Sequence, residues 1–153
     1  MNSYSKTAVV AYQKSQTNTI NELALVIMLY EGTLRFLKQS IDSIERNRIE
    51  HAHLLITRSR DIIAELLSSV DKKKGGKIAI DLTALYVYMF RTLVEANLTK
   101  DKEKINQVIG LLESLLDGWK TTKQSNSDSI DEPLERIASL RADKARKSTS
   151  IYG

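Results

Sequence analysis

The segment from about Ile78 to Leu98 is apolar on two opposite faces of the helix that its residue spacing predicts. One face carries Ile78, Leu82, Leu85, Tyr86, Met89, Leu93 and Ala96. The roughly opposite face carries Ile80, Val87, Val94 and Leu98, with Phe90 beside them. A helix in a small domain needs only one buried stripe. The second stripe must therefore pack on another helix of the chain, on another protein or on lipid.

The rest of the chain also favours helices. Six Gly, one Pro and few strand-like alternations accompany apolar residues that recur at i, i+3, i+4 and i+7. Long amphipathic helices joined by short links predict an all-α fold, an antiparallel up-and-down four-helix bundle over residues 19–121. We expect residues 1–18 to form a mobile N-terminal cap segment. Residues 122–153 read as a polar linker followed by a short helical or disordered extension.

Local signals predict where the helices begin and end. Thr19–Glu22 has the form of a capping box, so the first helix is expected to begin near Thr19 or Asn21 and to run to about Arg46. Asn47 is its expected terminator. The second helix is expected to stop at Lys72–Gly76, because cations followed by glycine favour a helix C-terminus.

The expected core consists of one apolar stripe on each helix. The first helix contributes Leu23, Val26, Ile27, Tyr30, Leu34, Leu37, Ile41 and Ile44. The second contributes Ala52, Leu55, Ile56, Ile63, Leu66, Leu67 and Val70. After a short link at 97–101, the fourth contributes Ile105, Val108, Ile109, Leu112, Leu115, Leu116 and Trp119.

Composition excludes several classes of protein. The absence of Cys excludes a disulfide framework and thiolate chemistry. The N-terminus has no signal-peptide pattern and no run of 18 uncharged apolar residues occurs, so we expect a soluble, unexported protein without membrane insertion. The net charge is +4, but Lys and Arg alternate with carboxylates, and charge alone therefore predicts no partner.

No catalytic, metal or cofactor site is predicted. His51 and His53 are two residues apart and point to different sides of a helix, which excludes a shared metal-binding face. The Lys72–Lys77 run combines glycines and lysines as phosphate-binding loops do. However, Ile78 stands where a Walker A motif needs Ser or Thr. We therefore expect a protein that binds other molecules and is not an enzyme.

The first and second helices also carry apolar residues outside their core stripes. These are Leu25, Leu29, Phe36 and Leu54, with Gly32 beside the first three. Together with Ile80, Val87, Phe90, Val94 and Leu98 they are the candidate wall of a groove for an amphipathic helix. The alternative is that the bundle buries flanking positions of this kind.

The segment before the first helix contains apolar and aromatic residues within a polar stretch, namely Tyr4, Val9, Val10 and Tyr12. Such a segment can lie across a groove as a removable cover, and would then compete with a partner for the same surface. A disordered leader with incidental aromatics is the alternative.

Several short runs occur in an order and spacing that a known family shares. They are Ala11–Gln13, Leu29–Leu37, Ile62–Leu67, Gly75–Ala79, Leu85–Met89 and Leu93–Asn97. Over about residues 8–120 the chain resembles the FliS-type flagellar secretion chaperones. It departs from them at Ile20-Asn21, where family members often have Ser-Pro, and at Glu31 and Val87, where they often have Asp.

The resemblance implies a cytosolic chaperone that binds the C-terminal segment of newly made flagellin, prevents its early polymerisation and presents it to the flagellar type III export gate. It also implies apolar grooves for client helices and a mobile N-terminal segment that covers a groove when no client is bound. The matching residues are Tyr12 and its neighbours for the cover, and Leu29–Phe36 and Leu85–Leu98 for the scaffold and groove wall.

Two other readings stay open. A basic helical module could bind nucleic acid through lysines and arginines of the second link and the tail, which are Lys72, Lys73, Lys74, Lys77, Arg141, Lys144, Arg146 and Lys147. Alternatively, the second stripes of two copies could meet across a twofold axis. The flagellin that serves as client and the role of residues 122–153 are not predicted.

Overall fold

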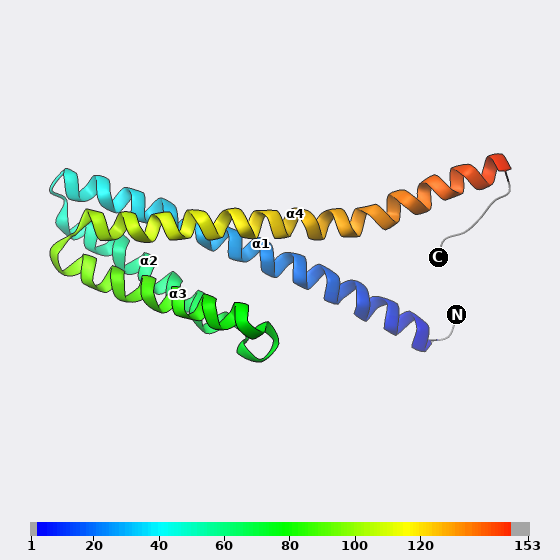
Figure 1. Cartoon of the computed structure of the whole chain (residues 1–153), viewed down its shortest axis with the longest axis horizontal. Coiled ribbons are helices and arrows are strands. Elements are labelled where there is room, and N and C mark those ends of the chain that lie inside the picture. Colours follow the sequence, from blue (N-terminus) through cyan, green and yellow to red (C-terminus); the bar gives the residue numbers. More distant parts are fainter. Residues whose placement is uncertain (1–2, 148–153) are drawn as a thin grey trace. The chain divides into compact units, whose positions relative to one another are not determined.

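The computed structural model describes the backbone of residues 3–147 and the side chains of residues 21–126. The elements are α1 (Ser3–Glu45), α2 (Ile49–Ser69), α3 (Lys72–Thr99) and α4 (Lys102–Lys147), and the described residues contain no strand. The chain separates into two compact units, residues 24–117 and a unit made of residues 1–23 and 118–153. Residues 24–117, hereafter the bundle, form an antiparallel four-helix bundle (Figure 1), which confirms the predicted fold class.

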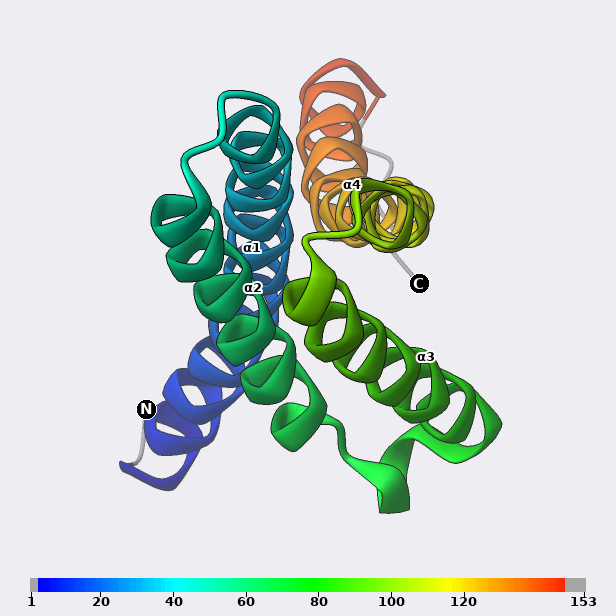
Figure 2. The ribbon, with the colours of Figure 1, turned by 90° about the vertical axis from the view of Figure 1, so that its left-hand side faces the viewer.

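The four helices follow one another around the bundle in chain order (Figure 2). Side-chain contacts join each of three neighbouring pairs. They are Arg60 with Phe90 and His53 with Asn97 between α2 and α3, Lys104 with Glu95 between α4 and α3, and Lys38 with Glu113 and Glu45 with Lys102 between α1 and α4. The helices α1 and α3 therefore lie at diagonal corners.

The buried stripes follow the predicted helical phases closely. The enclosed apolar residues are Ile27, Tyr30, Leu34, Leu37, Ala52, Leu55, Ile56, Ile63, Leu66, Ala79, Tyr86, Met89, Leu93, Ala96, Ile105, Val108, Ile109, Leu112 and Leu116. Several predicted core residues at the edges of the stripes, such as Val26, Ile41 and Leu67, are half-buried. The core consists of one side of each helix, as an amphipathic pattern requires.

Two tyrosines meet at the centre of this core. The hydroxyls of Tyr30 on α1 and Tyr86 on α3 lie 2.5 Å apart and form a hydrogen bond across the diagonal of the bundle. Their rings meet edge to face, with centroids 6.3 Å apart. Both side chains are almost fully enclosed, so each phenol satisfies the other in a place that water does not reach.

Small hydroxyl residues accompany the apolar stripes, and the apolar periodicity does not predict their burial. Thr33, Ser40, Ser59 and Thr92 are buried, and each donates its hydroxyl to a carbonyl of the preceding turn of its own helix. This bond satisfies the polar group locally. The short side chains leave room for neighbouring helices.

Two helix ends agree with prediction. Asn47 adopts a left-handed conformation (φ 58°) just after α1, and the Arg48 amide donates to the Ser43 carbonyl at 2.7 Å. The link between α3 and α4 is short, with Lys100 left-handed at the end of α3 and the Asp101 carboxylate accepting from the amides of residues 103 and 104.

The outer ends of α1 and α4 were predicted wrongly. Helix α1 begins at Ser3, and not at Thr19 or Asn21, and α4 continues through the supposed linker at 122–129 to Lys147. Neither segment, 3–20 or 122–129, contains Gly or Pro, so nothing in it breaks a helical backbone. A polar composition limits the burial of a segment but does not prevent it from forming a helix. The side chains of Tyr4, Val9, Val10 and Tyr12 lie outside the described residues.

The link between α2 and α3 also differs from prediction. Lys72–Gly76 does not end α2, because Asp71 accepts hydrogen bonds from the amides of Lys73 (3.1 Å) and Lys74 (3.2 Å) and so begins α3 at Lys72. One turn later Gly76 has φ 57° and ψ −135°, which puts a kink in the helix.

The predicted placement of Ile78 was also wrong. This residue was assigned to the core stripe, but it is 75% exposed, and Ala79 is buried in its place. Ala79 lies against the turn before the kink, since a Cβ built on Gly75 would come within 2.5 Å of the Ala79 Cβ. Ala79, and not Ile78, is therefore the first buried residue of α3 after the kink.

The glycine kink leads to a stability prediction. Replacing Gly76 with Ala forces an L-residue into a conformation that glycine adopts readily, so Gly76→Ala should lower the free energy of unfolding by about 1–3 kcal/mol. Gly110→Ala is the matched control, because Gly110 lies within α4 with open space around its Cα. That change should raise stability by roughly 0.5–1 kcal/mol. Urea unfolding followed by circular dichroism measures both, and equal effects would contradict the strained conformation at residue 76.

The tyrosine pair leads to a prediction about alkaline pH. Burial, and then the hydrogen bond with Tyr30, raise the pKa of Tyr86 well above its ordinary value of 10.0. The unfolded chain loses this proton near pH 10 while the folded state keeps it, so the contribution of Tyr86 is fully present below that pH and is lost as pH rises.

Between about pH 10 and 11, Tyr86→Phe should therefore flatten the fall of stability by up to ~1.4 kcal/mol per pH unit. Tyr88→Phe, which removes an exposed phenol of the same helix, is the control for the loss of a tyrosine hydroxyl. Urea unfolding at a series of pH values gives the slopes. If Tyr86→Phe retained the full slope, Tyr86 would not be held neutral by the fold.

Candidate partner-binding surface

The second apolar face of α3 remains outside the core. We call Ile80, Val87, Val94 and Leu98, with Phe90 at their edge, the α3 stripe. Ile80 is 63% exposed, Val94 38% and Leu98 81%, whereas Val87 and Phe90 are half-buried. Ile80, Val87, Val94 and Leu98 follow one another at intervals of seven, seven and four residues, so these four share one side of the helix.

The edge of the α3 stripe that faces α2 is polar. The Arg60 guanidinium of α2 lies over the Phe90 ring, 5.9 Å from its centroid, and also pairs with Asp61 at 3.3 Å. Further along the same seam, the Asn97 amide nitrogen lies 2.9 Å from His53 Nδ1. These contacts fix α2 against α3 and give the apolar stripe a hydrogen-bonding rim, as docking surfaces commonly have.

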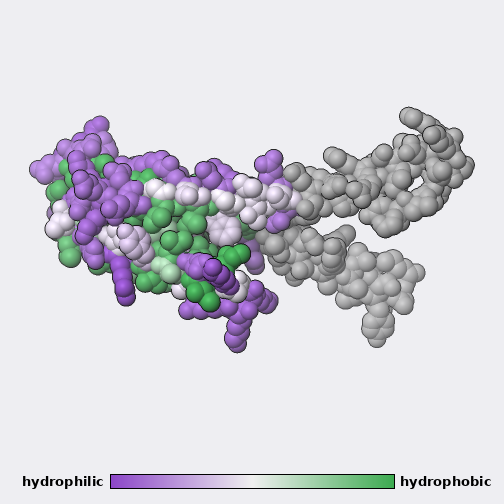
Figure 3. All heavy atoms as spheres, viewed as in Figure 1, coloured by the Kyte–Doolittle hydropathy of each residue, from purple (hydrophilic) through white to green (hydrophobic). Residues whose placement is uncertain are grey.

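Apolar residues reach the surface along α3 and between α3 and α4, surrounded by hydrophilic ones (Figure 3). This pattern differs from the scattered single exposures of an ordinary protein surface. A group of exposed apolar residues with a polar border is typical of a surface that another molecule covers.

A second apolar surface lies on α1. Leu25 is 55% exposed, Leu29 and Phe36 are half-buried, and Gly32 lies between them; we call Leu25, Leu29 and Phe36 the α1 line. Leu29 is nine residues before Lys38, about half a turn around α1 from the side that meets α4. The α1 line therefore faces away from α4. Met28, 68% exposed, was not predicted and adds to the apolar surface of this helix.

The nine predicted groove residues do not gather in one place. The α3 stripe and the α1 line lie on helices at diagonal corners of the bundle. Leu54, 43% exposed on α2, belongs to neither, because six residues turn it about 120° around α2 from Arg60 at the border of the α3 stripe. The structure therefore offers two separate apolar surfaces, with Leu54 isolated between them.

Four lysines surround the kink between α2 and α3. Lys72, Lys73, Lys74 and Lys77, which we call the lysine hinge, are all exposed, and none of them forms an ion pair within the described part of the chain. The hinge is adjacent to the α3 stripe, since Lys77 is three residues before Ile80 and such residues are neighbours on a helix surface. The basic tail residues Arg141, Lys144, Arg146 and Lys147 lie outside the described side chains.

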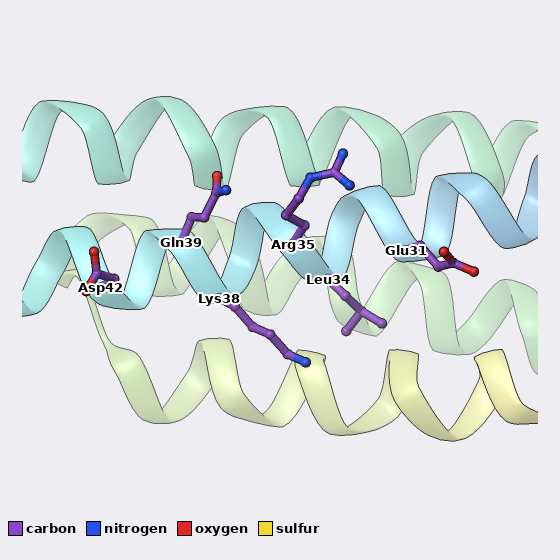
Figure 4. Close-up of a pocket in the computed structure, with 6 residues that line it drawn as sticks. All are labelled: Glu31, Leu34, Arg35, Lys38, Gln39 and Asp42. Atoms are coloured by element: carbon purple, nitrogen blue, oxygen red, sulfur yellow. The ribbon is translucent and has the colours of Figure 1, made fainter.

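A shallow hollow of about 540 Å³ follows the outer side of α1. The residues that line it are Glu31, Leu34, Arg35, Lys38, Gln39 and Asp42 (Figure 4). All six come from one helix, charges of both signs are present, and Lys38 points toward α4, where it pairs with Glu113 at 3.6 Å. The hollow therefore lacks the enclosed apolar walls and convergent polar groups that small-molecule sites have.

The described residues offer neither a metal-binding cluster nor a membrane-spanning helix. That part of the chain holds no cluster of three or more His, Cys, Asp and Glu side chains placed to bind a metal ion. No helix in it has the length and apolar character needed to cross a bilayer. His53 is engaged with Asn97, and His51 is exposed on another side of α2.

Comparison with known proteins identifies relatives over most of the chain. The family model described as "Flagellar protein FliS" matches residues 5–126. A flagellar secretion chaperone FliS of Campylobacter jejuni is 34% identical over 110 residues, which cover 72% of this chain and 86% of that protein. A FliS of Bacillus subtilis is 31% identical over 115 residues, 75% of this chain and 85% of the relative. A FliSB of Pseudomonas aeruginosa is 33% identical over 120 residues, which cover 76% of this chain and 95% of that protein.

Proposed function

The chain belongs to the FliS family of flagellar secretion chaperones, and from this membership we propose that it binds the C-terminal helical segment of flagellin. Binding in the bacterial cytosol would keep flagellin from polymerising early and deliver it to the flagellar type III export apparatus. The observation that carries the proposal is the α3 stripe, an apolar line of helical length on the outside of the bundle.

The shape of the α3 stripe suits a helix as the bound segment. Ile80, Val87 and Val94 are seven residues apart, and Leu98 follows one turn later. An amphipathic helix places its own apolar residues at i, i+3, i+4 and i+7, so two such lines can interdigitate along their length. The half-buried Phe90 and Val87 would form the floor, and the more exposed Ile80 and Leu98 would contact the flank of the bound helix.

Apolar burial is the expected source of affinity. Ordering a disordered segment on binding costs roughly 2–5 kcal/mol, while apolar burial contributes about 25 cal/mol per Å². An interface of roughly 2,000 Å² or more, of the kind seen in large helical contacts, outweighs that cost. Calorimetry should therefore show a strongly negative change in heat capacity and only a modest dependence of affinity on salt.

The α1 line is a second contact for the same client. Leu25, Leu29 and Phe36 lie on the other side of α2 from the α3 stripe, so a single short helix cannot cover both surfaces. A client with more than one helix can wrap around the bundle and use both. The N-terminal residues Tyr4, Val9, Val10 and Tyr12 are proposed to cover one apolar surface in the absence of client, which lowers the apparent affinity by the fraction of time it is covered.

Competing functions differ in their salt dependence and stoichiometry. Nucleic-acid binding through the lysine hinge and the basic tail would lose affinity steeply between low and physiological salt. Pairing of two copies through their α3 stripes would give a concentration-dependent mass in sedimentation. Apolar capture of a flagellin helix gives neither result.

The proposal is tested by placing a charge on each apolar surface. Val94→Asp and Leu29→Asp each put a carboxylate where an apolar contact is expected, and each should weaken binding of a flagellin C-terminal segment by tenfold or more, about 1.4 kcal/mol or above. Ser114→Asp, at an exposed position on α4, is the control and should bind as the parent does. Isothermal titration calorimetry measures the affinities.

Circular dichroism and thermal unfolding establish that each variant is folded. If both folded variants bound the flagellin segment as tightly as the parent, the two surfaces would not be the client site. If the parent itself did not bind the segment, the proposed function would be wrong.

A further inference from the structure

The two ends of the α3 stripe differ in charge. The segment Asp71–Asp81, which contains Ile80, has four lysines against two aspartates. The segment Glu95–Lys104, which contains Leu98, has three lysines against three carboxylates. An apolar helix seated on the stripe therefore has a cationic hinge at one end and a balanced set of charges at the other.

The difference is larger when existing contacts are considered. At the Leu98 end, Lys100 Nζ donates to the Asn97 carbonyl at 2.5 Å, Lys104 pairs with Glu95 at 3.0 Å and Lys102 pairs with Glu45 at 3.7 Å. Each of the three lysines at this end therefore already has a partner within the protein. At the other end the Asp71 carboxylate accepts from two backbone amides, and the lysine hinge has no ion pair among the described residues.

From this asymmetry we infer that a client helix lies on the α3 stripe with its C-terminal end at the lysine hinge, antiparallel to α3. The inference rests on the proposed function and specifies the direction of binding. The expected partner is an amphipathic helix whose last turn carries free carbonyls, acidic side chains or a chain-terminal carboxylate.

The physical basis is the polarity of an α-helix. Its last four carbonyls lack intrahelical partners, and the C-terminus carries a partial charge of roughly −0.5. Lysine ammonium groups at that end donate to the free carbonyls and offset the negative charge. The reversed helix would place its positive N-terminus against four unpaired lysines. Apolar contacts along the stripe contribute in either direction, so the charge at the ends decides between them.

The length of the stripe makes the direction measurable. Ile80 and Leu98 are 18 residues apart, and a rise of about 1.5 Å per residue puts roughly 27 Å between them. The chain has no Cys, so one introduced cysteine carries one label. Ser68→Cys marks the hinge end and Thr99→Cys marks the Leu98 end, and both side chains are exposed.

The experiment measures distances by pulsed electron paramagnetic resonance. A nitroxide is attached to either cysteine variant of the full chain, and a second to the first or the last turn of each helix in a flagellin C-terminal segment. For the helix whose binding Val94→Asp weakens, the last-turn label should lie closer to residue 68 than to residue 99 by on the order of 20 Å. The opposite order, or equal distances, would refute the assigned direction while leaving the proposed function intact. Loss of binding altogether in the labelled parent would count against the function itself.

Charge reversal tests the cause of the direction. Lys74→Glu combined with Lys77→Glu should weaken binding roughly five- to tenfold at low salt, and the deficit should shrink as salt is added. Arg46→Glu combined with Arg58→Glu makes the same change in net charge at exposed positions away from the hinge, and should alter affinity less than twofold. Equal losses in the two double variants would mean that overall charge, and not the lysine hinge, acts on the client.

Discussion

The hydrogen bond between the Tyr30 and Tyr86 hydroxyls fixes which side of α3 points into the bundle. It joins the diagonal helices at the centre of the core, where an unpaired phenol would be costly. Val87 follows Tyr86 in the sequence and is therefore turned about 100° away from it. Rotating α3 to bury Val87 and Val94 would break the bond and expose Tyr86. The packing that stabilises the fold thus holds the α3 stripe on the outside.

Helical periodicity predicted most of the core because burial on one side of a helix repeats in sequence. It gave the fold class and the enclosed stripes, and it put Tyr30 and Tyr86 on inward faces. It could not give the buried Thr33 or Ser59, since a hydroxyl bonded to its own helix has no distinctive pattern. Helix ends depend on which nearby side chains cap the free backbone groups. The lysine run was predicted to end α2, but the Asp71 carboxylate caps the next helix, so the lysines begin α3.

The candidate surface was predictable only in part, for a geometric reason. The phase of a residue on its own helix can be read from sequence, so Ile80, Val94 and Leu98 were predicted on an outward face, and the structure places them there. Which outward faces lie next to one another depends on how the helices are arranged. Leu54 has a suitable exposure, yet it lies away from both the α3 stripe and the α1 line. The roles of all these residues in binding remain predictions.

An apolar surface alone gives a chaperone strength of binding without direction. The hydrophobic effect depends on the area removed from water and is nearly indifferent to the polarity of the bound helix. Exposed charges contribute less, about 0.2–1 kcal/mol for each surface pair, but they change sign when the helix is reversed. In a stripe with lysines at one end and paired charges at the other, apolar burial therefore supplies the affinity and the lysines set the direction of the bound helix. The kink at Gly76 supports this division, because it places Lys77 at the start of the stripe while the helix before it stays outside the core.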